Sequence, residues 1–412
     1  MGAQSASVIV SSGYSLIFTH VDPEKHAHVM SPCWPEYERE SLSVVESRLS
    51  RLLGCQYPVI QTAMGWIADA NLVAATGRAG GFGFLAGAVM SPEDVARSIA
   101  EIRCQTDAPF GVNFHMYTPR AKQIVDICIA EQIRAVSYSR SPDPATIERF
   151  KAAGIICIPT VGALKHALKA VQLGADALVI QGSEGGGHTG QVATSILVPQ
   201  VSASVTVPLA AAGGFRDGRG LVAALSLGAD GIAMGTHFLL TQESPVPEAT
   251  KRIYLETAPE RIIVSAALDG MPQRMVLNNQ LQSLISASSL VVLVRAVKNA
   301  FSLSRQTGDS PWALLKSGWR MYRAGDQSLS ATMMSANAPM MIQEAVVHGR
   351  PDSGILPSGQ IAGLIEDLPT VNSLVSSIVS EALATIEKLG KVGVLDASVA
   401  ASTAHLPEDG SQ

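Results

Sequence analysis

The sequence predicts an α/β protein, a (β/α)8 TIM barrel followed by a C-terminal helical appendage. Short β-rich runs alternate with amphipathic helical stretches through the first 240 residues, and eight such units fit into about 190 residues. The glycine-rich turns follow the late strands of this series. An open doubly wound sheet is the alternative, but its glycine-rich turn would follow the first strand.

The eight expected strands are short apolar runs with flanking turn residues. They cover residues 58–61, 81–86, 110–115, 135–139, 155–160, 177–181, 208–212 and 231–234. Helical patterns between them cover residues 91–104, 119–132, 144–153, 164–173 and 218–227. Ser91 and Asp143 are expected N-caps, because each is a good capping residue followed by proline at the first helical turn.

The strand–helix alternation stops near Thr241, and helical patterns follow. They cover residues 282–304, 311–324, 331–348 and 371–389. We therefore expect a flexible N-terminal extension over 1–40, a barrel over 41–245, a helical substrate or lid region over 246–390 and a flexible tail over 391–412.

Composition excludes several classes of protein. The chain has 412 residues, 47% of them hydrophobic and 16% charged, and a net charge of -5 gives no reason to expect nucleic acid or an anionic membrane as partner. No apolar run reaches the roughly 18–20 residues that span a bilayer. The five cysteines are scattered without a C-x-x-C pair, so we expect no disulfide framework and no metal site. A cytoplasmic enzyme with a small-molecule substrate is expected, and a homo-oligomer is possible.

The densest functional motif is the segment Gln181-Gly-Ser-Glu-Gly-Gly-Gly-His188-Thr-Gly190, which follows the sixth expected strand. Glycine is entropically costly to order, so such a cluster indicates close approach to a ligand or unusual dihedral angles. Histidine is the side chain most often suited to proton transfer at neutral pH, and a run of glycines leaves His188 no core to occupy. The segment predicts a flat cofactor on bare backbone beside a proton-transfer group.

Two segments resemble nucleotide-binding motifs, but each lacks a feature that its motif requires. The segment Gly182–Thr189 matches a P-loop except that His188 stands where the lysine belongs, so no fixed cation is available for a nucleotide's β- and γ-phosphates. The segment Gly81-Phe-Gly-Phe-Leu-Ala-Gly87 has G-x-G-x-x-x-G spacing within a strand, which favours close packing over dinucleotide binding.

A phosphate site is expected after the seventh and eighth strands, where this barrel commonly binds phosphate. Gly213 and Gly214 end the seventh strand just before a helix, and Gly235 and Thr236 end the eighth. The absence of a cationic clamp points to a phosphate monoester held by backbone, as in FMN. Two ordinary tight turns are the alternative. Arg216 and Arg219 either contribute charge at the phosphate or are solvated at the surface, the expected role for at least one of them.

Other polar or flexible residues stand at strand ends. Gln61, Met64 and Gly65 follow the first strand, and Asn113 ends the third, where it either bonds a flavin ring or is a satisfied amide of the barrel rim. His115 and His237 are weaker functional candidates than His188, and His166 is expected on the exposed face of a helix.

Together these motifs resemble the flavin-dependent barrel family of nitronate monooxygenases and FMN-type enoyl-acyl-carrier-protein reductases. The matching segments are 58–65, 110–113, 181–190, 211–220, 228–236 and 358–360. The resemblance implies FMN, with Gln181 and Asn113 near the isoalloxazine and the residues of the strand 7 and 8 turns at the phosphate. It also implies that His188 is catalytic. The full expected set of cofactor-binding residues is Gln61, Met64, Gly65, Asn113, Gln181, Gly186, Gly187, Gly213, Gly214, Gly235, Thr236 and Gln360.

Within that family the segments 185–190, 246–255, 269–274 and 358–369 are most similar to an actinobacterial subgroup that acts on an indene-carboxyl-CoA intermediate of steroid ring C/D breakdown. The resemblance implies a reductase in which NADH or NADPH passes hydride to the acyl-CoA through flavin N5, while His188 serves as acid or base. The alternative is a nitronate monooxygenase that oxidises alkyl nitronates with O2. A sugar-phosphate aldolase is a third class, but the strand ends lack a Schiff-base lysine or paired acids.

A CoA phosphate would need a cationic partner near the barrel–appendage cleft. The candidates are Arg252, Arg274, Arg320 and Arg323, each with a surface charge as the alternative.

Overall fold

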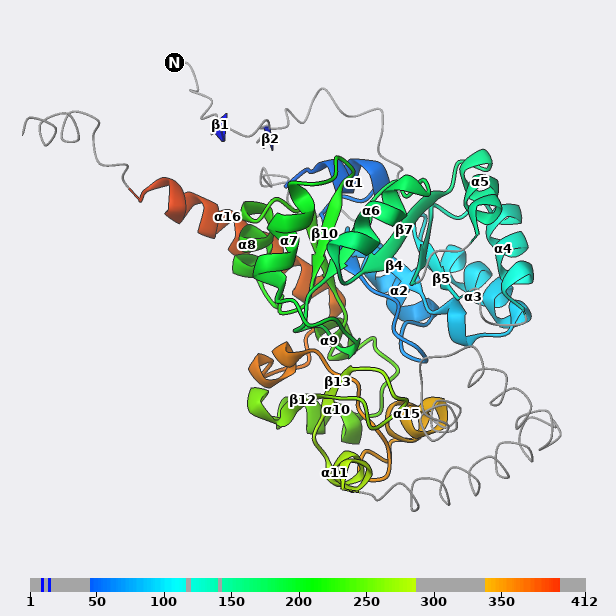
Figure 1. The fold of residues 1–412 in the computed structure, drawn as a ribbon, viewed down its shortest axis with the longest axis vertical. Coiled ribbons are helices and arrows are strands. Elements are labelled where there is room, and N and C mark those ends of the chain that lie inside the picture. The colour runs from blue at the N-terminus through cyan, green and yellow to red at the C-terminus, as the bar shows by residue number, and fades with distance from the viewer. Residues whose placement is uncertain are drawn as a thin grey trace, which may run out of the picture.

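The computed structural model describes residues 9–10, 14–15, 45–115, 120–139, 143–286 and 338–392. Eight parallel strands close into a barrel in the order β10-β11-β3-β4-β5-β6-β7-β8, which confirms the predicted fold class (Figure 1). These strands are β3 (Val59–Gln61), β4 (Phe82–Leu85), β5 (Gly111–Phe114), β6 (Ala135–Tyr138), β7 (Ile156–Val161), β8 (Leu178–Gln181), β10 (Leu209–Ala212) and β11 (Gly231–Met234). Each lies no more than one residue outside its predicted range.

Helices follow the barrel strands, and those over residues 92–105, 121–130, 144–152, 164–172 and 218–226 match the predicted helical patterns, whereas those over 70–78 and 194–202 have no predicted counterpart. They are α2 (Ala70–Arg78), α3 (Pro92–Gln105), α4 (Ala121–Ala130), α5 (Pro144–Ala152), α6 (Leu164–Gln172), α7 (Thr194–Ser202), α8 (Gly218–Ser226) and the short α9 (Thr236–Leu239), with a 3-10 turn η1 (Gly87–Val89) after β4. The Ser91 hydroxyl accepts from the Asp94 N–H and the Asp143 carboxylate from the Thr146 N–H. Both predicted N-caps are therefore confirmed.

The barrel interior is a packed core that is sealed at one end. Phe82 and Phe84 of β4 point inward and pack edge to face with ring centroids 5.1 Å apart. Small side chains from β10 and β11 face them, which leaves room for the two rings. Helix α1 (Arg48–Leu53) adds Leu49 and Leu53 to the same core. Figure 1 shows α1 at the end of the barrel away from the appendage, so the opposite end is the mouth.

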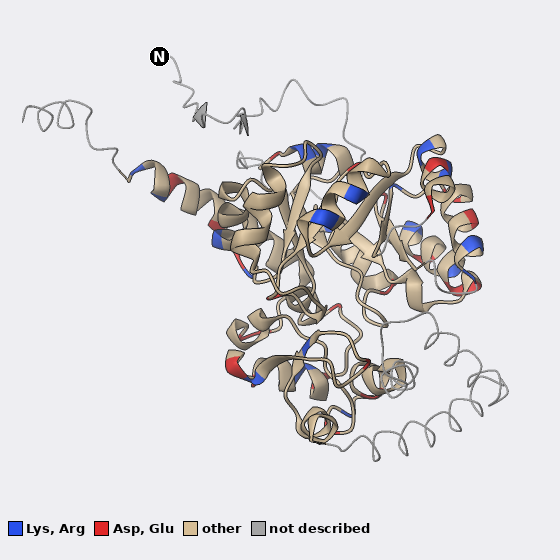
Figure 2. Cartoon of the chain, in the orientation of Figure 1, with Lys and Arg blue, Asp and Glu red and all other residues tan. Residues whose placement is uncertain are grey.

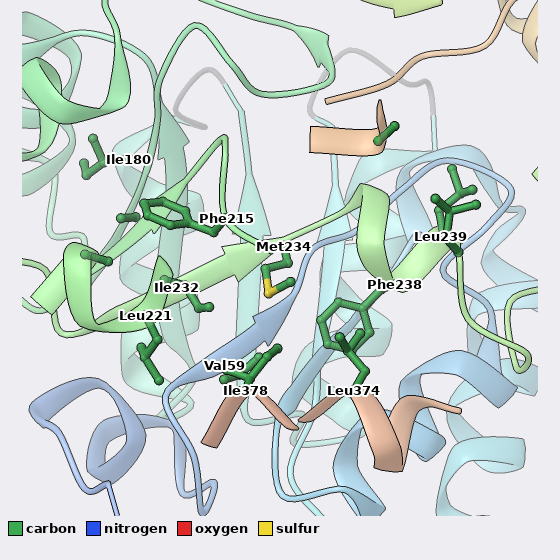
Figure 3. Packing of buried hydrophobic residues seen from close by; sticks show 14 of the residues in the cluster. Val59, Ile180, Phe215, Leu221, Ile232, Met234, Phe238, Leu239, Leu374 and Ile378 are labelled. Atoms are coloured by element: carbon green, nitrogen blue, oxygen red, sulfur yellow. The ribbon is translucent and has the colours of Figure 1, made fainter. Parts of the chain in front are cut away.

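The longest described helix, α16 (Val371–Gly390), packs on the outside of the barrel. It lies against α8 and α2, and its buried residues Leu374 and Ile378 join the cluster that contains Val59 of β3 (Figure 3). The sequence predicts this helix but assigns it to the lid region. Its apolar face instead packs between α8, which follows the seventh barrel strand, and α2, which follows the first.

The appendage contains a three-stranded sheet in addition to helices, and the sequence does not predict this sheet. Its order is β12 (Ile262–Ser265), β13 (Gln273–Val276) and β9 (Gly187–His188), with antiparallel neighbours. Helices α10 (Glu248–Leu255), α11 (Asn279–Ile285) and α15 (Ala338–Val346) and the 3-10 turns η2 (Pro259–Arg261) and η3 (Gln360–Leu364) complete it. The appendage has its own small core, formed by Leu268, Met275, Leu281, Leu284, Ala338, Met341 and Ile355.

Some predictions lie outside the described residues. They include the side chains of residues 1–40, the helix 311–324, most of the helix 282–304, the first part of the helix 331–348, and the tail after residue 392. The described N-terminal pieces are β1 (Ile9–Val10) and β2 (Tyr14–Ser15), which pair antiparallel.

Basic and acidic residues are interspersed on the outer helices of the barrel (Figure 2). Several outer helices carry ion pairs, among them Arg103–Glu131 at 2.5 Å, Arg149–Asp126 at 2.6 Å and Lys151–Asp176 at 2.9 Å. Among the described residues, no helix combines the length and the apolar character needed to cross a bilayer.

We predict that Ile378→Ala lowers the free energy of unfolding by about 2–5 kcal/mol, because it removes a buried side chain that the surrounding helices cannot replace. Chemical denaturation measures the effect. Ser376→Ala on the exposed face of the same helix is the matched control and should leave the transition unchanged. An unchanged transition in Ile378→Ala would show that α16 is not part of the barrel's cooperative unit.

Candidate active site

The glycine–histidine segment leaves the barrel after β8 and ends in the sheet of the appendage. Gly187 and His188 form β9, which pairs with Arg274 and Gln273 of β13. The Thr189 N–H then donates to the Pro272 carbonyl at 3.2 Å. The segment therefore bridges the barrel mouth and the appendage, and the position of His188 depends on both.

Two long polar side chains hold this segment in place. Gln181, at the end of β8, donates from Nε2 to the His188 carbonyl at 2.9 Å. Arg274 donates from Nε to the Ser183 carbonyl at 2.9 Å and from Nη1 to the Ile262 carbonyl at 3.0 Å. Burial lowers the pKa of Arg274, while the nearby Glu184 raises it. Arg274 is thus a buried structural cation, and neither predicted alternative for it, a surface charge or a CoA-phosphate ligand, fits this position.

The His188 ring meets two side chains of the appendage. Its Nε2 lies 2.7 Å from Asp269 Oδ2 and 3.0 Å from Gln273 Nε2, and Gln273 Nε2 donates to the same Asp269 oxygen at 2.5 Å. The His188 side chain is 56% exposed, whereas that of Asp269 is 6% exposed. An accessible imidazole therefore rests on a buried carboxylate.

Asp269 is held in its ionised form. Burial raises the pKa of this carboxyl, but hydrogen bonds from His188, the Met271 N–H and Gln273, together with the charge of His188, outweigh burial and bring the pKa below the ordinary value of 3.8. The stability that these contacts contribute is present above pH 3.8 and is lost as the pH falls through the lowered pKa.

Four glycine-containing segments predicted for the site converge in the structure. A Cβ on Gly213 would lie 3.0 Å from the Gly185 nitrogen, and one on Gly186 would lie 2.5 Å from the Gly359 nitrogen. The Thr236 hydroxyl accepts from the Gly359 N–H at 2.9 Å. The Gln360 N–H donates to the Glu184 carbonyl at 3.0 Å. The glycines are required here because backbone approaches backbone.

The turn after β3 completes the mouth. The Thr62 hydroxyl donates to the Met234 carbonyl of β11 at 3.2 Å, and a Cβ on Gly235 would lie 3.4 Å from the Met64 sulfur. A Cβ on Gly65 would lie 3.3 Å from Val89 of η1. Trp66 follows with φ of 62°, a left-handed conformation that is strained for a bulky residue. The sequence carries no signal for this strain.

Gln61 and Asn113 use their amide donors within the barrel. Gln61 is fully buried and donates to the carbonyls of Thr62 and Phe84, while its Oε1 has no hydrogen-bond partner in the described part of the chain. Asn113 donates to the Ser137 carbonyl at 3.1 Å and contacts the Ser137 hydroxyl at 3.3 Å. Asn113 is thus a satisfied rim amide on its donor side.

The features of this mouth fit FMN. Gly214 is exposed with φ of 83°, and the nearest atom to a Cβ placed there is Glu184 Cβ at 3.6 Å, so a side chain would fill open space in front of the backbone. Gly213 beside it also has a positive φ of 100°, and successive N–H groups in such a turn form an anion-binding concavity. The unpartnered Gln61 Oε1 leaves a buried acceptor for a ligand donor.

The remaining candidates are engaged elsewhere. His237 is buried in α9 and donates from Nδ1 to the Arg216 carbonyl at 2.9 Å, and burial lowers its pKa. Arg216 and Arg219 both pair with Asp217, at 3.2 and 2.5 Å. His115 Nδ1 lies 3.5 Å from the Ser139 hydroxyl. His166 is exposed on α6, as predicted.

The four arginines proposed to bind a CoA phosphate differ in their surroundings. Arg252 is exposed on α10, and Arg274 is buried as described above, whereas Arg320 and Arg323 lie outside the described residues. No group of three or more metal-ligating side chains occurs among the residues that the structure describes.

The family model described as nitronate monooxygenase matches residues 46–134 and 117–381, which covers the barrel, the glycine–histidine segment and the appendage. The chain belongs to the nitronate monooxygenase family. This family comprises flavin-dependent oxidoreductases, and the chain is accordingly an oxidoreductase.

Two curated relatives bear the same name, (3aS,4S,5R,7aS)-5-hydroxy-7a-methyl-1-oxo-octahydro-1H-indene-4-carboxyl-CoA dehydrogenase. The one from Rhodococcus jostii is 44% identical over 85% of this chain and 99% of its own length. The one from Mycobacterium tuberculosis is 42% identical over 82% of this chain and 96% of its own length. Among solved structures, FabK from Thermotoga maritima has a TM-score of 0.69 and 30% identity, and the match covers 84% of this chain and 98% of that chain.

Sequence reasoning assigned no role to Asp269 and Gln273. Both lie in the segment 269–274 that supports the resemblance, about 80 residues after His188. The one feature of the sequence that could have pointed to them is an acid and an amide four residues apart within this segment. Their contact with His188 depends on the pairing of β9 with β13, which the sequence does not reveal.

We predict that Gly186→Ala destabilises the site by about 1–3 kcal/mol, because the new methyl group would overlap the backbone of Ser358 and Gly359. Thermal unfolding and the FMN content of the purified protein measure the effect, and both should fall. Gly390→Ala at the end of α16, where a Cβ meets nothing within 4 Å, is the control and should change neither. A wild-type FMN content and midpoint in Gly186→Ala would contradict this close packing.

Proposed function

We propose that this protein is an FMN-dependent oxidoreductase of a CoA thioester, of the steroid ring C/D type, in which His188 moves the proton. The observation that carries the proposal is the half-exposed His188 ring at the mouth, held from behind by a buried carboxylate. The names of the two relatives support a CoA thioester of a fused-ring acid as the substrate class.

The proposed cofactor seat uses the convergent segments. Gly213, Gly214, Gly235 and Thr236 would hold the phosphate of FMN by backbone N–H groups and a hydroxyl, without a cationic clamp. The residues that would hold the flavin ring belong to the glycine–histidine segment, the strand ends and the segment 358–360, and they are Gln61, Met64, Gly65, Asn113, Gln181, Gly186, Gly187 and Gln360. When bound, FMN supplies the hydride chemistry that protein side chains lack.

His188 would act as a general acid or base at the carbon skeleton of the substrate. In the direction of reduction, the substrate gains a hydride and a proton, and His188 donates the proton. In the direction of dehydrogenation, the substrate loses both, and His188 accepts the proton. The sequence predicts reduction with NADH or NADPH, whereas the two relatives are named for dehydrogenation. Because a catalyst accelerates a reaction in both directions, the experiment has to test both reduction by NADH or NADPH and dehydrogenation of the thioester.

A second candidate function is oxidation of alkyl nitronates with O2, which the description of the matching family model favours. In that reaction His188 would act on the nitronate, and NADH or NADPH would not be needed.

The visible spectrum of the purified protein separates these functions. We expect a yellow protein whose flavin absorbance is bleached anaerobically by NADH or NADPH, or by an indene-carboxyl-CoA substrate. Bleaching by propane-2-nitronate alone, with no response to NADH, NADPH or the thioester, would overturn the proposal in favour of the monooxygenase. A colourless protein that binds no added FMN would overturn both functions.

We predict that His188→Ala lowers turnover by about 10²–10⁴-fold, which is the usual contribution of a positioned general acid or base. FMN content should be unchanged, because the variant removes a side chain and leaves the backbone of the seat in place. His166→Ala is the matched control, since it removes an exposed histidine from α6 and should keep wild-type turnover. Wild-type turnover in His188→Ala would exclude His188 as the proton-transfer group.

A further inference from the structure

We propose that Asp269 is the positioning residue of His188. Its carboxylate accepts the Nε2–H of the ring, fixes that tautomer, and leaves Nδ1 as the nitrogen that exchanges a proton with substrate. The role of Nδ1 rests on the proposed function, but the tautomer is a property of the protein alone. The two parts can therefore be tested separately.

The proton positions follow from a triangle of short contacts. Its corners are His188 Nε2, Asp269 Oδ2 and Gln273 Nε2, and its sides are 2.7, 2.5 and 3.0 Å. An ionised carboxylate can only accept hydrogen bonds. The 2.7 Å contact therefore needs a proton on His188 Nε2, and the 2.5 Å contact uses a proton of the Gln273 amide. The 3.0 Å distance then separates two donors, His188 Nε2 and Gln273 Nε2, which lie close together because both donate to Asp269 Oδ2.

The opposite tautomer does not satisfy this triangle. A neutral ring with its proton on Nδ1 would present the lone pair of Nε2 to the Asp269 carboxylate at 2.7 Å, where two acceptors repel. A hydrogen bond from the Gln273 amide to either of these acceptors would not remove the repulsion between them. The arrangement is satisfied without repulsion when Nε2 carries the proton.

The carboxylate itself is held rigidly. Asp269 Oδ1 accepts from the Met271 N–H at 3.0 Å, so both oxygens are engaged and the carboxylate plane is set. Gln273 is buried and stands opposite His188 in the β9–β13 pair, so their side chains share one face of the sheet. A weak surface ion pair would show neither feature.

The other charged groups of the adjoining elements point elsewhere. Arg274, next to Gln273 on β13, directs its guanidinium to the carbonyls of Ser183 and Ile262. Glu184, in the glycine–histidine segment, accepts from the backbone and hydroxyl of Thr194 at 3.0 and 2.8 Å. Among the residues that the structure describes, Asp269 is thus the carboxylate that contacts the ring, and Nδ1 forms no hydrogen bond with a side chain of these residues.

This arrangement divides the site between two parts of the fold. The barrel presents His188 at the end of a glycine segment, and the appendage supplies the group that sets its protonation pattern. In each catalytic cycle one proton would pass between substrate and Nδ1, while the Nε2 proton and the charge of Asp269 stay in place. An ionised Asp269 also stabilises the ring when Nδ1 gains its proton.

Asp269→Asn tests the tautomer directly. Because the Met271 N–H needs an acceptor at the Oδ1 position, the oxygen of the new amide should occupy that place and its NH2 should face His188 Nε2. The same NH2 replaces the oxygen that accepts from Gln273 Nε2, so the Gln273 amide should turn its own oxygen toward it. The ring must then accept at Nε2 and carry its proton on Nδ1. Nitrogen-15 NMR of the holoenzyme with labelled histidine distinguishes the two forms, and the His188→Ala spectrum assigns this ring among the nine histidines.

We expect the wild-type spectrum to show a protonated Nε2, and the Asp269→Asn spectrum a protonated Nδ1, at a pH where the ring is neutral. We also expect kcat to fall by about 10²-fold or more in Asp269→Asn, with little change in KM and with FMN content unchanged. Asp269→Glu keeps a carboxylate, and it should keep the Nε2–H form and recover part of kcat. Asp352→Asn removes an exposed carboxylate of the appendage and is the control for charge alone.

The outcomes separate this proposal from the proposed function. A protonated Nδ1 in the wild-type protein, or the same tautomer in wild type and Asp269→Asn, would overturn the positioning role whatever the substrate proves to be. If His188→Ala is inactive while Asp269→Asn turns over like wild type, the positioning role fails and the role of His188 stands. If His188→Ala keeps turnover, the proposed function of His188 fails even when the tautomer is as expected.

Discussion

The antiparallel pairing of Gly187–His188 with Gln273–Arg274 is the constraint on which the rest of the site depends. It takes a segment that begins at the carboxyl end of a barrel strand and makes it the edge of a sheet in the appendage. The pairing sets His188 opposite Gln273, and it brings the loop that carries Asp269 beneath the ring. Without it, a run of glycines would leave the imidazole without a defined orientation.

Close backbone packing is the second requirement of the mouth. The glycine–histidine segment touches the turn after β10 on one side and the segment 358–360 on the other, at separations that a Cβ would violate. Polar side chains then hold the segment from outside, with Gln181 bound to its far end and Arg274 to its start. Glycine thus permits the approach, and side chains from flanking strands restrict the freedom that glycine brings.

Much of the fold could be predicted because its pattern is local. Eight apolar runs matched the barrel strands, since a strand buried on both faces needs a continuous apolar stretch. The sheet of the appendage was missed for the opposite reason. β9 has two residues, and β13 begins with Gln273 and Arg274, whose burial depends on partners far away in the sequence. The helix α16 was found, but its periodicity does not say that α8 and α2 cover it.

The sequence by itself determined the barrel, the glycine-rich mouth and His188 as the residue to examine, because each follows from local composition and spacing. Only the tertiary structure decided which groups surround that histidine. It buried Arg274 and His237 as structural residues, engaged the donors of Asn113, and joined Asp269 to His188 across 81 positions of chain. A contact of that separation is specified by strand register and packing, and no short stretch of residues encodes it.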